Sequence, residues 1–167
     1  VEKLRQIEFR RGDFGLKEPM SRLGLGPKTQ VFQALHGFWQ PRFFSSEFLM
    51  HDLPIEGAAA FVRELEKAGA CVRYITGRHV SGMWEGTKIS LKTHGFPLSD
   101  DFIEMCLKPE FKMDDAEFKV ELIKTLATGF DEIWLFENEP VNINRISQRL
   151  PQVQCVFIDT CHCGAER

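Results

Sequence analysis

The sequence predicts an α/β fold with a parallel sheet, because strand-like and helix-like segments alternate through most of the chain. The first observation is spacing: beyond Pro54, short apolar runs are separated by stretches with helical apolar periodicity. The second is the run at 133–136, which is almost continuously apolar, as in a strand buried on both faces of a parallel sheet. With 167 residues, 43% of them hydrophobic and 27% charged, the chain is long enough for one globular domain with a core.

Residues 1–53 are expected to form a helical cap or inserted segment. Residues 1–12 are charged and compatible with a helix, and a second helix is predicted at 30–39, after a Gly-rich loop at 23–29. Part of that loop, 26–29, is similar to a fragment of a phosphate-binding P-loop. Because no strand precedes it and the first Gly of the motif is absent, we interpret it as a turn that caps the next helix.

Residues 54–167 are expected to form the α/β core. Helices are predicted at 56–67, at 80–93, from 114 or 115 to 128, and at 140–150. Strands are predicted at 71–75, 103–107, 133–136 and 153–158. Glycines at positions 69, 95 and 129 follow the first three of these helices, and glycine favours a helix C-terminus.

The composition excludes several classes of partner and site. A net charge of −3 gives no reason to expect a nucleic acid, because its binding proteins usually have a basic face. No apolar run is long enough to span a bilayer, so no membrane partner is expected. Five cysteines at irregular spacing do not form a disulfide pattern, which indicates a reducing compartment such as the cytoplasm. Cys161-His162-Cys163 is interpreted as a terminal tail rather than a metal clip, because zinc-ligating cysteines are usually farther apart.

The most informative stretch is 74–79, at a predicted junction between a strand and a helix. In open α/β sheets ligands bind beyond the carboxyl ends of the strands, and a helix N-terminus there offers N–H donors to an anion. Thr76, Gly77 and Arg78 are therefore candidates for phosphate binding. The alternative interpretation is that Thr76 is only the N-cap of the helix.

Two further residues occupy comparable positions. Lys119 lies in the first turns of a predicted helix, and Glu137 lies where the next strand ends. Strand ends of one polarity meet at one edge of a parallel sheet, so we expect Thr76, Lys119 and Glu137 to line a single small pocket. Together a hydroxyl, an ammonium and a carboxylate suit a phosphoryl group and a divalent cation, and Mg²⁺ prefers oxygen ligands.

Residues 54–159 resemble the haloacid dehalogenase superfamily of phosphatases in the order and spacing of these motifs. Thr76 matches the family's second motif and Lys119 its third, and the resemblance implies a catalytic role for both. Glu137-Asn138 stands where the fourth motif usually carries paired aspartates, which implies Mg²⁺ ligation by Glu137, Asn138 and Glu139. Asn138 brings no charge, so weaker cation binding is expected. The implied fold is a three-layer, Rossmann-like parallel sheet with strand order 5-4-1-2-3.

The family's first motif, an Asp-x-Asp at the end of the first strand, is not found at any strand end in this sequence. The four predicted strands match the second to fifth strands of the family, which would leave the centre of the sheet empty. An empty central position would leave two rows of backbone groups unpaired. We therefore expect the first-motif strand, with its nucleophilic Asp, to lie upstream of Val1.

The resemblance implies a Mg²⁺-dependent phosphomonoesterase that acts on a small phosphorylated substrate through an aspartyl-phosphate. The alternative is a related binding protein with weak or no catalysis. Substrate specificity is expected to come from the segment before Pro54, in which Trp39, Phe43 and Phe44 could form an apolar cap, although their spacing favours simple packing.

Some assignments have alternatives. Lys108 competes with Lys119 for the third motif, and we prefer Lys119 because one helix and a short loop separate it from the fourth-motif strand, as in the family. Glu139 either reaches a metal through water or favours the N-terminus of the following helix. His79 and His94 are interpreted as residues at the start and end of a helix rather than as catalytic groups.

Overall fold

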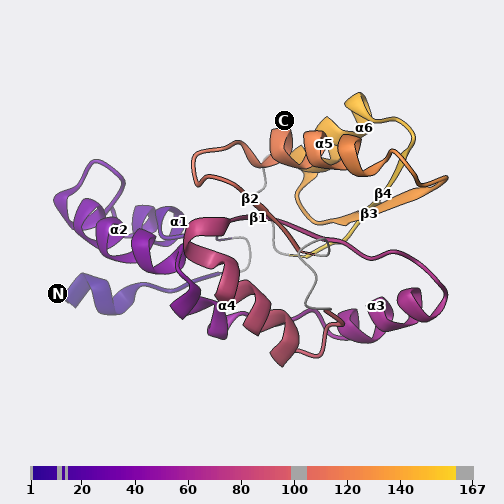
Figure 1. Ribbon diagram of the computed structural model, residues 1–167. Coiled ribbons are helices and arrows are strands. Elements are labelled where there is room, and N and C mark those ends of the chain that lie inside the picture. Colours follow the sequence, from indigo (N-terminus) through magenta and orange to yellow (C-terminus); the bar gives the residue numbers. More distant parts are fainter. Residues whose placement is uncertain (1, 11–12, 14, 99–104, 161–167) are drawn as a thin grey trace. The chain divides into compact units, whose positions relative to one another are not determined.

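The computed structural model describes residues 2–10, 13, 15–98 and 105–160, and it shows a mixed α/β protein (Figure 1). Its short 3₁₀ helices are η1 (Glu2–Gln6) and η2 (Ser46–His51). Its α-helices are α1 (Lys17–Arg22), α2 (Gln30–Phe43), α3 (Ala58–Lys67), α4 (Val80–Thr93), α5 (Asp115–Leu126) and α6 (Pro140–Arg149). Its strands are β1 (Tyr74–His79), β2 (Met105–Lys108), β3 (Ile133–Glu137) and β4 (Val153–Phe157). No helix in this described part of the chain is both long and apolar enough to cross a membrane.

The four strands form two parallel pairs. β1 pairs with β2, and β3 pairs with β4 in an unbroken register from Ile133↔Val153 to Glu137↔Phe157. The α/β class and the parallel direction predicted from the sequence are confirmed. The complete strand order stays a prediction.

Most element boundaries agree with the sequence prediction, and α4 has the predicted limits. The segment 1–12, which the sequence marked as compatible with a helix, contains the five-residue 3₁₀ helix η1 among its described residues. The helix predicted at 30–39 continues to Phe43 and contains Pro41. Cys71, Cys106 and Cys155 are free thiols. The predicted tail Cys161-His162-Cys163 lies outside the described residues, and so do positions 103–104 of the second predicted strand.

β1 is where the sequence prediction fails most clearly. The strand was expected at 71–75, with 74–79 forming the junction to the next helix, but it runs from Tyr74 to His79, and Thr76 pairs with Leu107 inside the ladder. The register is irregular between Thr76 and His79, the interval that contains Gly77. Pairing with β2 therefore overrides the weak strand preference of glycine, which often marks such an irregularity. His79, and not Thr76, is the N-cap residue of α4, and His94 is its C-cap residue.

The chain divides into two compact units, one formed by 40–115 and the other by 1–39 with 116–167. The first contains η2, α3, α4 and the β1–β2 pair. Its core includes Leu49, Met83, Met105 and Leu107, with Phe44 and Trp84 among the side chains packed against them. In the second unit, the buried side chains include Val120 and Ile123 of α5, Ile146 of α6 and Val153 of β4. The predicted domain boundary at 53/54 stays a prediction.

The packing of η2 on α4 depends on two glycines one helical turn apart. The Ser46 hydroxyl donates to the Gly82 carbonyl oxygen (3.0 Å) and accepts from the Gly86 N–H (3.0 Å). A Cβ atom on Gly86 would lie 2.6 Å from both the Cα and the carbonyl oxygen of Ser46. Since backbone atoms form this contact, rotation of a side chain cannot relieve it. The close approach therefore requires glycine at position 86.

We expect Gly86→Ala to destabilise the protein, because overpacking of this kind typically costs about 1–3 kcal/mol. Gly37→Ala is the matched control, since Gly37 is also inside a helix and has open space around it. Because alanine favours a helix more than glycine does, Gly37→Ala should raise the free energy of unfolding by about 0.5–1 kcal/mol. Urea unfolding monitored by circular dichroism measures both changes, and equal effects of the two substitutions would contradict the packing described.

A cluster of ion pairs joins α5 to α6. Arg149 donates to Glu117 (2.5 Å) and to Glu121 (2.8 Å), and Arg145 also pairs with Glu117. The pKa of Glu117 lies below its ordinary value of 4.5, chiefly because it accepts a hydrogen bond from Arg149, with further lowering by Arg145. These side chains are partly exposed, so their stabilisation is modest and sensitive to salt.

This cluster predicts a pH-dependent stability. A carboxyl group with a lowered folded-state pKa stabilises the protein above its unfolded-state pKa, and that stabilisation is lost as pH falls through the folded-state value. Arg149→Ala should therefore lower the urea midpoint at pH 7 and have much less effect below the folded-state pKa of Glu117. Lys67→Ala, which removes an exposed pair with Glu64, is the control on another helix. A midpoint difference that stays constant on acidification would contradict this role for Glu117.

Candidate functional site

Lys119 and Glu137 form an ion pair buried between α5 and the end of β3. The two residues are only 8% and 6% exposed. Lys119 lies on the face of α5 that also carries Ala116, Val120 and Ile123, all of them buried, so helical periodicity turns its side chain inward. Parallel pairing of β3 with β4 extends to Glu137, whose carbonyl oxygen also accepts from the N–H of Ile158 (2.9 Å).

The Glu137 carboxylate has four hydrogen-bond donors around it. Oε2 accepts from the Lys119 ammonium and from the Asn142 side-chain amide (3.2 Å). Oε1 accepts from the backbone N–H groups of Asn138 (3.0 Å) and Glu139 (3.1 Å). A carboxylate has about four lone-pair positions, so all of them are in use. Glu137 thus joins the end of β3 to the start of α6.

This arrangement does not fit Glu137 as a direct ligand of Mg²⁺. A cation could reach Oε2 only if the Lys119 ammonium moved away, and two positive charges would otherwise compete for one oxygen. In the described ranges 2–10, 13, 15–98 and 105–160, no group of three or more His, Cys, Asp or Glu side chains is arranged to hold a metal ion.

Asn142 belongs to this cluster, although sequence reasoning did not select it. It is 3% exposed, and its Oδ1 is buried without a hydrogen-bond partner among the described residues. Its position in the first turns of α6, five residues after Glu137, was the available signal, since residues at a helix start lie near the end of the preceding strand.

Thr76, Gly77 and Arg78 lie in β1, in the other compact unit. The Thr76 hydroxyl accepts from the N–H of Arg78 at 3.3 Å, which is a long hydrogen bond. The location of all three candidate residues in a common pocket with Lys119 and Glu137 stays a prediction. The alternative interpretation of Thr76 as a helix N-cap is wrong, because α4 begins at Val80 and its N-cap residue is His79.

Lys108 and Asp115 stand close to the Thr76–Gly77 segment. The buried Lys108 ammonium donates to the carbonyl oxygens of Phe111 (3.2 Å) and Met113 (2.8 Å) and to the Asp115 carboxylate. A Cβ atom on Gly77 would lie 2.3 Å from Asp115 Oδ2, so the carboxylate occupies the space beside Gly77. Lys108 therefore closes the loop between β2 and α5.

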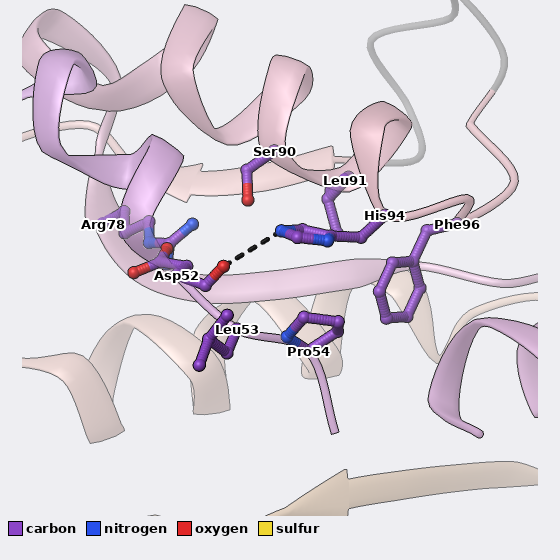
Figure 2. Close-up of a pocket in the computed structure, with 8 residues that line it drawn as sticks. All are labelled: Asp52, Leu53, Pro54, Arg78, Ser90, Leu91, His94 and Phe96. Atoms are coloured by element: carbon purple, nitrogen blue, oxygen red, sulfur yellow. Dashed lines mark hydrogen bonds and ion pairs between the residues drawn. The ribbon is translucent and has the colours of Figure 1, made fainter. Parts of the chain in front are cut away.

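Arg78 takes part in a different contact. Its guanidinium forms an ion pair with Asp52 at one side of a pocket in the 40–115 unit (Figure 2). His94 also lines this pocket, and its Nε2 is 3.0 Å from the backbone oxygen of Asp52. Sequence reasoning missed Asp52 as a partner of Arg78, since 26 residues separate them and no motif links them.

The buried pair predicts an asymmetry between single and double substitutions. Lys119→Met should destabilise the protein by about 3–5 kcal/mol, because it leaves a buried carboxylate without its counter-ion. Adding Glu137→Gln to that variant should recover part of the loss, since the amide oxygen can still accept from the backbone N–H groups. A double-mutant cycle by urea unfolding measures the coupling, and additive losses would contradict the pairing.

Comparison of the chain with protein-family models, with curated proteins and with solved structures finds no match.

Proposed function

We propose that this chain forms the phosphate-binding α/β part of a Mg²⁺-dependent phosphomonoesterase of the haloacid dehalogenase type, acting in the cytoplasm on a small phosphorylated substrate. The observation that carries the proposal is the strand pairing. In the order 5-4-1-2-3, the second strand lies beside the third and the fourth beside the fifth. The parallel pairs β1–β2 and β3–β4 agree with those two neighbourhoods.

The same order requires a strand between the two pairs. Each described strand has one ladder partner, and parallel sheets of only two strands are unusual because such sheets are normally buried and larger. We propose that a strand upstream of Val1 takes the central position and supplies the nucleophilic Asp, which completes the three-layer arrangement.

In this proposal each residue has a limited task. The Thr76 hydroxyl and the Gly77 backbone bind phosphoryl oxygens, and Lys119 offsets the negative charge that develops during transfer. An oxygen of the upstream Asp attacks phosphorus, and the bond from phosphorus to the alcohol oxygen breaks while the second Asp of that Asp-x-Asp gives the alcohol oxygen a proton. Water then hydrolyses the aspartyl-phosphate and releases inorganic phosphate. Neither of the two assigned side chains is suited to the attack, because Lys119 is paired with Glu137 and no hydrogen bond among the described residues links the Thr76 hydroxyl to a base.

Mg²⁺, when bound, would neutralise charge on the phosphoryl oxygens. We propose that its binding near Glu137, Asn138 and Glu139 requires Lys119 to release Oε2 of Glu137. Competition of this kind predicts weak Mg²⁺ affinity.

A second candidate function is a phosphate-ester binding protein with little or no catalysis. The full hydrogen bonding of the Glu137 carboxylate favours it, because a carboxylate satisfied by protein donors has no lone pair left for a metal. The coding sequence upstream of Val1 discriminates between the two candidates. An apolar strand that ends in Asp-x-Asp supports the hydrolase, and any other sequence there supports the binding protein.

Binding of inorganic phosphate to the chain itself tests the shared part of both candidates. Thr76→Val, which removes one donor and keeps the shape, should weaken binding about tenfold, as expected for the loss of a hydrogen bond to a charged group. Thr93→Val, at the exposed end of α4, is the control and should change nothing. Calorimetric titration with and without Mg²⁺ measures the effect, and equal affinities of the two variants would contradict the role of Thr76.

A further inference from the structure

The pocket beside Arg78 has a size that suits a small organic group. Its volume is about 140 Å³, and it is lined by residues of β1, of α4 and of the segments 52–54 and 94–96 (Figure 2). An engineered apolar cavity of about 150 Å³ binds benzene, so this volume accommodates about six non-hydrogen atoms. All the lining residues lie in the 40–115 unit, so the pocket is complete within it.

The charges that line this pocket cancel. Arg78 and Asp52 form an ion pair whose side chains are 29% and 41% exposed, so both groups remain accessible at the pocket surface. An anionic ligand would meet the Asp52 carboxylate, and a cationic ligand would meet the Arg78 guanidinium. A neutral ligand avoids both repulsions, and a hydroxyl group can donate to Asp52 and accept from Arg78 at the same time.

Ser90 on α4 and His94, the C-cap residue of that helix, add further polar groups one helical turn apart. The backbone oxygen of Asp52 can only accept a hydrogen bond, so Nε2 of His94 carries the proton in that contact. In that tautomer Nδ1 is an acceptor. Figure 2 shows the Ser90 hydroxyl directed toward the interior of the pocket. Leu91, Phe96 and Pro54 provide apolar surface for carbon atoms.

We propose that this pocket binds a neutral, hydroxylated carbon chain of a few atoms, and that it is the subsite for the alcohol part of a small phosphate ester. A polyol has hydroxyl groups on a carbon backbone. Its hydroxyl groups can bond to the donors and acceptors of the pocket, and its carbon atoms can lie against the apolar surface. The assignment of the phosphoryl end rests on the proposed function, because Arg78 follows Thr76 and Gly77 directly in β1. The polyol specificity rests on the pocket alone.

Binding measured by NMR chemical-shift changes tests the inference with four probes: erythritol, glycerol 3-phosphate, inorganic phosphate and toluene. Glycerol 3-phosphate should bind at least tenfold more tightly than inorganic phosphate, and erythritol should shift the signals of Ser90 and His94. Ser90→Leu, which fills the pocket, should abolish the erythritol shifts and leave the affinity for inorganic phosphate unchanged. Ser81→Leu, at an exposed position on the same helix, is the control.

A second variant keeps the test decisive if Ser90→Leu folds poorly. Asp52→Asn removes the negative charge opposite Arg78, so the variant should prefer glycerate, a carboxylate of similar size, over erythritol. Failure of the two hypotheses is distinguishable. Erythritol binding without phosphate binding leaves the pocket assignment standing and overturns the proposed function. Phosphate binding with no advantage for glycerol 3-phosphate, or tighter binding of toluene than of erythritol, overturns the pocket assignment.

Discussion

The buried contact between Lys119 and Glu137 organises the unit that contains the β3–β4 pair. Glu137 lies at the end of β3, and its carboxylate accepts hydrogen bonds from the turn at Asn138 and Glu139 and from Asn142 in the first turns of α6. Together with the bond from Lys119, these contacts hold the chain where β3 leads into α6. Burying an ammonium and a carboxylate is expensive unless the remaining lone pairs are satisfied. Here the backbone and Asn142 satisfy them, so the pair persists because the surrounding residues complete its hydrogen bonds.

The 40–115 unit also contains a buried lysine, Lys108, but its hydrogen-bond partners differ from those of Lys119. Lys108 is buried like Lys119, but two of its three donors go to backbone carbonyl oxygens of the loop that follows β2. Its counter-ion, Asp115, lies against Gly77, where a Cβ atom would displace the carboxylate. Each buried lysine therefore stabilises the fold around it. To bind phosphate, either ammonium group would have to give up or share hydrogen bonds that it already makes.

The sequence predicted the elements whose signals are local and missed the features that depend on distant contacts. The limits of α4 follow from its apolar periodicity and from Gly95, which are visible within the segment itself. The extension of β1 through Gly77 depends on pairing with β2, about thirty residues later, and no local pattern indicates it. Lys119 and Glu137 could be selected as candidate site residues from their positions at a helix start and a strand end, but their pairing with each other could not. The sequence also could not predict that four donors would satisfy the Glu137 carboxylate, since this depends on the path of the turn between β3 and α6.

The bridge between Ser46 and α4 has a consequence for how this protein can vary. The hydroxyl joins the same two backbone groups, of Gly82 and Gly86, that form a hydrogen bond within a helix. A larger residue at position 86 meets the main chain of Ser46, which every amino acid shares, so no replacement at position 46 can compensate for it. Among homologous sequences, position 86 should therefore tolerate change only together with a shift of the whole η2 segment, whereas position 46 should alternate among small residues whose side chains fit against two glycines.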